Sequence, residues 1–138
     1  MMNLRSKIMW LILFLLFVAS CTSPRGIECT KIDDIDTSIT IKKSTQPIIG
    51  LNTDTDSLKF GTVSPKAIVQ RKMTVQYSNQ ADILVKMEGD FAAWTEINPS
   101  QFSLQPAEKK EVIFLVAVPE EVREGNFTGK AVFCFREG

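Results

Sequence analysis

Residues 126–135, NFTGKAVFCF, alternate between outward polar and inward apolar positions with a period of two. The apolar face carries Phe127, Ala131, Phe133 and Phe135, and the opposite face carries Asn126, Thr128 and Lys130. This period is typical of a β-strand with one buried face. It recurs at residues 38–42, 69–77 and 82–88, with turn residues such as Ser78-Asn79-Gln80 between the runs. The pattern therefore predicts an all-β, antiparallel sandwich of about seven to nine strands.

The first twenty residues have a different character. Arg5 and Lys7 precede an unbroken apolar run, Ile8–Val18, of eleven residues. A membrane-spanning helix needs about 20 apolar residues, so this run is too short to cross a bilayer comfortably. Its length and basic flank are those of a secretory signal helix. We expect residues 1–20 to be a signal peptide and the rest of the chain to lie outside the cytoplasm.

The residues after the apolar run, Val18-Ala19-Ser20-Cys21, resemble the lipobox of prokaryotic lipoprotein signals. The resemblance implies cleavage before Cys21 and a diacylglycerol on its sulfur, although the family usually has Leu where Val18 stands. The protein would then be held on a membrane by lipid, at the cell surface or in the periplasm. Ordinary signal cleavage nearby and an uncleaved anchor remain alternatives.

Composition argues against several classes of function. The chain has 16 basic and 16 acidic residues, whereas a nucleic-acid-binding protein needs a basic surface. It has no histidine, the commonest general base and the commonest metal ligand. It also has no phosphate-binding glycine loop and no Ser/His/Asp set. We therefore expect no enzyme activity, no cofactor, no metal site and no small-molecule substrate.

The second half of the chain shows an ordered series of short motifs. They are LKFGTV at 58–63, GDFAAW at 89–94, NPSQFSLQP at 98–106 and EGNFTG at 124–129. This order resembles the immunoglobulin-like sandwich modules of secreted prokaryotic envelope proteins, which are similar to major-sperm-protein modules. The resemblance implies an immunoglobulin-like fold and a binding or structural role. Two turn positions depart from it, because Lys66 and Ala107 follow Pro65 and Pro106 where the family usually has Gly.

The resemblance covers only residues 57 to about 136, which suggests three regions. We expect a signal peptide at 1–20, a tether and N-terminal extension with one or two strands at 21–56, and the sandwich at 57–138. If Cys21 carries lipid, Cys29 and Cys134 remain as a pair in an oxidising compartment. A disulfide between them would close a loop of about 100 residues and stabilise the fold by up to about 4.7 kcal/mol. The alternative is two free, half-buried thiols.

One predicted strand, VIFLVAV at 112–118, is apolar on both faces. If it shares a sheet with residues 126–135, their outer surface carries an apolar interaction patch of Ile113, Leu115, Ala117, Val132 and Cys134. Exposed patches of this kind are normally covered or used for binding. We favour cover by the chain's own N-terminal extension, which is rich in isoleucine, over cover by a partner protein.

Three further motifs have weaker interpretations. The acidic groups at 33–36 and 52–57 are best explained as solvated turns, because the second lacks the glycine and glutamate of a calcium loop. Asn126-Phe127-Thr128 is a glycosylation sequon. Trp94, Phe91 and Phe102 would form a sugar-binding face if they were exposed. The leading interpretation is a non-catalytic, lipid-anchored protein that binds or braces another envelope component, and the alternative is a carbohydrate-binding surface module.

Overall fold

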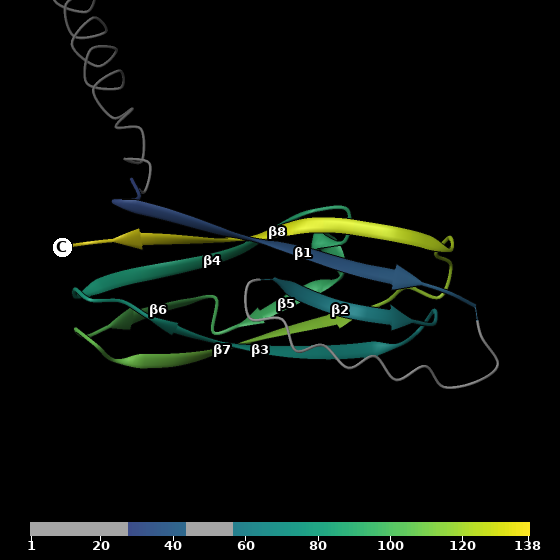
Figure 1. Ribbon diagram of the computed structural model, residues 1–138, viewed down its shortest axis with the longest axis horizontal. Helices are drawn as coiled ribbons and strands as arrows, with labels where there is room; N and C mark the ends of the chain where they lie inside the picture. Colours follow the sequence, from purple (N-terminus) through teal and green to yellow (C-terminus); the bar gives the residue numbers. More distant parts are fainter. Residues whose placement is uncertain (1–27, 44–56) are drawn as a thin grey trace, which may run out of the picture.

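The computed structural model describes residues 28–43 and 57–138 (Figure 1). The predicted signal helix and Cys21 lie outside these residues. The described chain forms eight strands and one short 3-10 turn, listed here with their bounds: β1 Lys31–Ile41, β2 Leu58–Val63, β3 Ile68–Gln76, β4 Ala81–Gly89, η1 Ala92–Trp94, β5 Thr95–Asn98, β6 Gln101–Leu104, β7 Lys109–Ala117 and β8 Gly125–Arg136. The all-β prediction is confirmed.

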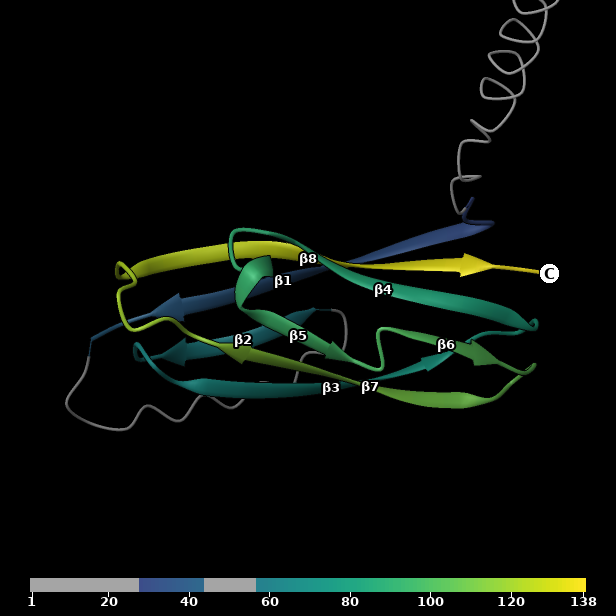
Figure 2. The ribbon, with the colours of Figure 1, turned by 180° about the vertical axis from the view of Figure 1, so that it is seen from behind.

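The strands form two sheets. Sheet A has five strands in the order β2-β1-β8-β4-β6, and sheet B has three in the order β3-β7-β5. Figures 1 and 2 show the two layers from opposite sides, with β8 and β4 in one layer and β3 and β7 in the other. The result is a sandwich-like domain whose buried faces meet between the sheets.

The apolar core lies where the alternation predicted it. Val112, Phe114 and Val116 of β7 are fully buried, and Phe133 and Phe135 of β8 are at most 4% exposed. The rings of Phe114 and Phe133 meet edge to face across the two sheets, with 6.4 Å between their centroids. This pair therefore joins the central strand of sheet B to the central strand of sheet A.

The N-terminal extension contributes a strand, β1, to sheet A. β1 pairs with β8 in antiparallel fashion over its whole length of 11 residues, and its second half pairs with β2 in parallel. The parallel pair departs from the expected all-antiparallel arrangement. β1 enters sheet A because Ile35, Ile39 and Ile41 alternate on one face and fill the core. The sandwich therefore begins at β1 rather than near residue 57, and this strand does not cover the outside of a sheet.

Two proline turns put residues other than glycine in a left-handed conformation. Lys66 and Ala107 have φ values of 66° and 63°. Each follows a proline inside a turn closed by a backbone hydrogen bond, from Ala67 N–H to the Ser64 carbonyl and from Glu108 N–H to the Gln105 carbonyl. This is the geometry of a type II turn, whose third position favours glycine. Positions 66 and 107 therefore have a backbone conformation that favours glycine.

Ala107→Gly should stabilise the protein. The left-handed conformation costs a residue with a Cβ about 1–2 kcal/mol, and glycine relieves this cost in the folded state. Glycine also gives the unfolded chain more conformational freedom, which offsets part of the gain in stability. We expect a net increase of about 0.5–1 kcal/mol in the free energy of unfolding, measured by urea denaturation. Ala117→Gly is the matched control, because Ala117 is also exposed but lies on an ordinary strand backbone, and it should have the opposite sign. A loss of stability in Ala107→Gly would contradict this account.

Candidate functional site

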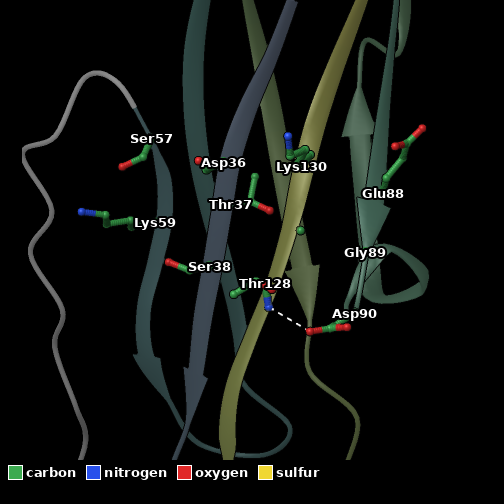
Figure 3. Close-up of a pocket in the computed structure, with 11 residues that line it drawn as sticks. Asp36, Thr37, Ser38, Ser57, Lys59, Glu88, Gly89, Asp90, Thr128 and Lys130 are labelled. Atoms are coloured by element: carbon green, nitrogen blue, oxygen red, sulfur yellow. Dashed lines mark hydrogen bonds between the residues drawn. The ribbon is translucent and has the colours of Figure 1, made fainter.

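A shallow groove of about 600 Å³ lies on the outer face of sheet A, and we call it the polar groove (Figure 3). It crosses β2, β1, β8 and the end of β4. Its lining is mostly charged and hydroxyl side chains: Asp36, Thr37, Ser38, Ser57, Lys59, Glu88, Asp90, Thr128 and Lys130, with Gly89 and Gly129.

Two glycines meet at one end of this groove. Gly89 and Gly129 face each other in the pairing of β4 with β8. A Cβ added at Gly89 would lie 2.5 Å from the Gly129 Cα, and a Cβ added at Gly129 would lie 2.4 Å from the Glu88 carbonyl oxygen. Neither position accepts a side chain. Next to them, Asp90 N–H donates to the Thr128 carbonyl at 2.9 Å, and Thr128 N–H donates to Asp90 Oδ2 at 3.1 Å (Figure 3).

An ion pair fixes the charge of Lys130, one of the residues that line the groove. Lys130 Nζ donates to Asp34 Oδ2 at 2.7 Å, and this hydrogen bond lowers the pKa of Asp34 from its usual value. The same bond raises the pKa of Lys130, and the charges of Asp34, Asp36 and Glu88 add to the effect. Both shifts hold the pair in its charged form across the neutral range. In residues 28–43 and 57–138, no three Cys, His, Asp or Glu side chains are grouped in a way that could hold a metal ion.

A disulfide joins Cys29 to Cys134, with 5.3 Å between their Cα atoms. It links a residue two positions before β1 to the outer face of β8, so it fastens the start of the described chain to the central strand of sheet A. Disulfides persist in oxidising compartments, and this bridge therefore indicates an extracytoplasmic location. In the described part of the chain, no helix is long and apolar enough to cross a membrane.

The predicted apolar patch is not one surface. β7 and β8 lie in different sheets, so Ile113, Leu115 and Ala117 face outward from sheet B while Val132 and Cys134 face outward from sheet A. The expectation was wrong because alternation shows which face a residue takes, not which strands are neighbours.

On sheet B, the pairing of β3 with β7 adds one residue that the sequence analysis missed. Ile68 lies opposite Ala117 and is 69% exposed. The alternation predicts a strand that begins at Val69, and Ile68 lies one residue earlier, on the opposite face. Ile68, Ile113, Leu115 and Ala117 together form what we call the apolar strip.

The remaining candidates are separate from one another. Asn126 is exposed at the start of β8, and its Oδ1 accepts a hydrogen bond of 2.8 Å from the Thr40 hydroxyl. Phe91 is fully buried, and Trp94 is half-buried against Phe127 with 5.1 Å between ring centroids. Phe91, Trp94 and the half-buried Phe102 therefore do not form an exposed aromatic face. The acidic residues 52–56 lie outside the described residues.

Comparison with known proteins finds no matching family model, no matching curated protein and no matching solved structure. Two surfaces of the domain differ clearly in chemistry: the polar groove on sheet A and the apolar strip on sheet B.

Proposed function

We propose that this is a non-catalytic, lipid-anchored extracytoplasmic protein whose immunoglobulin-like domain binds or braces another component of the cell envelope. The observation that carries the proposal is the apolar strip on the outer face of sheet B. Antiparallel sheets commonly leave that face wet and polar. An apolar row at this place is typical of a protein-binding surface.

The surroundings of the apolar strip support a protein partner. Gln70 and Glu96 flank Leu115 on the two neighbouring strands, and Lys72 and Asn98 flank Ile113. Lys72 also forms an exposed salt bridge of 3.3 Å with Glu111. An apolar centre with a polar, charged rim is the usual anatomy of a protein–protein interface.

Lipid on Cys21 would hold this surface close to a membrane. Seven residues separate Cys21 from Cys29, where the disulfide begins. Even fully extended, this tether spans about 28 Å. A diacylglycerol supplies the two chains that stable anchoring requires. The carbohydrate-binding alternative has less support, since Phe91 is buried and adds nothing to an aromatic platform.

Leu115→Lys tests the proposal. We expect it to abolish a crosslink to a partner in native membranes, because a charge at the centre of the apolar strip would have to be desolvated in the interface. The half-buried Leu115 lies on the outer face, so we expect a change in stability of at most about 1 kcal/mol. The measurement is crosslinking followed by pull-down, together with a thermal melt of each variant.

Val132→Lys is the matched control, because Val132 is also half-buried and outward-facing but lies on sheet A. It should keep the crosslink. Cys21→Ala, carried through the same fractionation, should release the protein from membranes or block its maturation. A crosslinked species that survives Leu115→Lys unchanged would rule out the apolar strip, and a membrane-bound Cys21→Ala protein would rule out the lipid anchor.

A further inference from the structure

The first half of β1 has a neighbouring strand on only one side. β1 pairs with β8 from Lys31 to Ile41, but its pairing with β2 begins at Thr37. Figure 1 shows β2 beside only the later part of β1. Among the described residues, no strand pairs with 31–36 on the side away from β8. We call this side the free edge of β1.

One hydrogen bond shows which backbone groups of β1 point to the free edge. Lys42 N–H donates to the Val63 carbonyl at 2.9 Å, so residue 42 points toward the β2 side. Successive residues of a strand point their backbone groups to opposite sides. The amides of Asp36, Asp34 and Ile32 therefore face the free edge, while those of Asp33 and Ile35 face β8.

A slot opens beside this edge, on the side of the core. It has a volume of about 160 Å³ and lies between β1, β8 and the second half of β3. Its apolar lining is Ile35, Met73, Val75, Phe133 and Phe135. A cavity of about 150 Å³ holds a molecule of benzene, so the slot has room for one large apolar side chain.

The charges beside the free edge are mainly acidic. Asp33, Asp34 and Asp36 lie within residues 31–36, where Lys31 is the one basic residue. Lys31 pairs with Asp33 at 2.8 Å, and Asp34 pairs with Lys130 of β8. A second copy of β1 added along this edge would bring two acidic strands together, and like charges on paired strands are destabilising. The charge pattern therefore favours a basic strand over a second copy.

We propose that the free edge of β1 is a strand-addition site for an extended peptide segment of a partner, in which apolar residues alternate with Lys or Arg. The segment would lie beside residues 31–36, on the same side of β1 as β2. Its backbone would pair with Ile32, Asp34 and Asp36, one apolar side chain would fill the slot, and its basic side chains would lie beside Asp34 and Asp36. Backbone pairing would supply affinity and the slot would supply specificity.

Amide hydrogen exchange tests this at single residues. In the oxidised full-length protein in detergent, the amides of Ile32, Asp34 and Asp36 should exchange at least about tenfold faster than those of Asp33 and Ile35, which pair with β8. An eight-residue peptide of alternating valine and lysine should then slow Ile32, Asp34 and Asp36 by about tenfold or more, without changing Asp33. Peptides of alternating valine and glutamate, or with alternate N-methylated amides, should have no such effect.

Two variants at one position separate backbone pairing from charge. Asp34→Pro removes an amide that faces the free edge and leaves the ladder with β8, so it should abolish peptide binding. Asp34→Asn keeps the amide and removes the charge, so it should bind more weakly with less salt dependence. Unchanged exchange at Ile35 and Thr37 would show that both variants are folded.

Three results would overturn the proposal. The first is slow exchange at Ile32, Asp34 and Asp36 in the free protein, which would mean that another part of the chain or a second copy already occupies the edge. The second is no protection by the lysine peptide at millimolar concentration. The third is equal binding to the glutamate peptide or to Asp34→Pro. None of these depends on the apolar strip, because Leu115→Lys leaves this edge intact.

Discussion

Replacing Phe114 with alanine should lower the free energy of unfolding by about 3–5 kcal/mol. Phe114 is fully buried at the centre of sheet B, and its ring packs edge to face against Phe133 of sheet A. The substitution removes the apolar surface of a whole ring and leaves a cavity between two sheets whose backbones cannot close over it. Domains of this size have a total stability of about 5–15 kcal/mol, so a large part of the stability would be lost.

Urea denaturation of the oxidised protein measures this effect, with the slope of the transition as an internal check. A lower midpoint with an unchanged slope would show that the protein is less stable but still exposes the same amount of surface on unfolding. Phe102→Ala is the matched control, because Phe102 lies half-buried on the short outer strand β6 and its removal should cost clearly less. Equal losses for the two variants would contradict the central position assigned to Phe114.

The burial pattern of the two central strands, β7 and β8, could be predicted from the sequence. Val112, Phe114 and Val116 repeat at every second position, as do Phe133 and Phe135, so both their strand state and their inward direction follow from the pleat. The turns were also readable, since Pro65-Lys66 and Pro106-Ala107 occupy positions whose left-handed backbone the structure shows.

Strand order was not readable from the same pattern. Alternation describes one strand at a time, and the partner of a strand depends on contacts between residues far apart in the chain. For this reason a shared outer face of β7 and β8 was only a conditional expectation, and the two strands belong to different sheets. The acidic residues Asp33, Asp34 and Asp36 likewise obscure the first half of β1, because pairing with β8, not intrinsic preference, makes this segment a strand.

The polar groove, the apolar strip and the free edge of β1 all depend on strand order, so the sequence predicts them only in part. The polar groove had a signal in Gly89 and Gly129, since a lone glycine within a strand often marks a close backbone approach. Their mutual position, however, follows from the pairing of β4 with β8. Ile113 and Leu115 were identified from VIFLVAV alone, whereas Ile68 and the free edge of β1 required the neighbouring strands to be known.

Removing the bridge between Cys29 and Cys134 should have the other large effect. The two residues are 105 positions apart, so the bridge closes almost the whole described chain into a loop. In the chain-entropy model, a loop of this length restricts the unfolded state by about 4.7 kcal/mol, and losses measured for native disulfides are about 2–5 kcal/mol. We expect the double variant Cys29→Ala with Cys134→Ala to fall in this range.

The native contacts at this end should survive in that variant. Thr30 N–H donates to the Phe135 carbonyl at 2.7 Å, and Glu137 N–H donates to the Thr30 hydroxyl at 3.1 Å, so β1 stays attached to β8 without the bridge. The destabilisation should therefore act on the unfolded chain, which becomes more expanded when the loop is opened. Urea denaturation should accordingly show a lower midpoint and a steeper slope, because unfolding exposes more surface.

Wild-type protein in reductant is the matched control, since it opens the same loop without changing a side chain. It should reproduce both the midpoint and the slope of the double variant. Cys134 is only 7% exposed, so its sulfur is packed in the fold. Any difference in midpoint between the reduced wild type and the double variant would therefore come from the loss of this packing and not from the bridge. A double variant as stable as oxidised wild type, or one that loses stability with no change in slope, would show that the bridge does not act by restricting the unfolded chain.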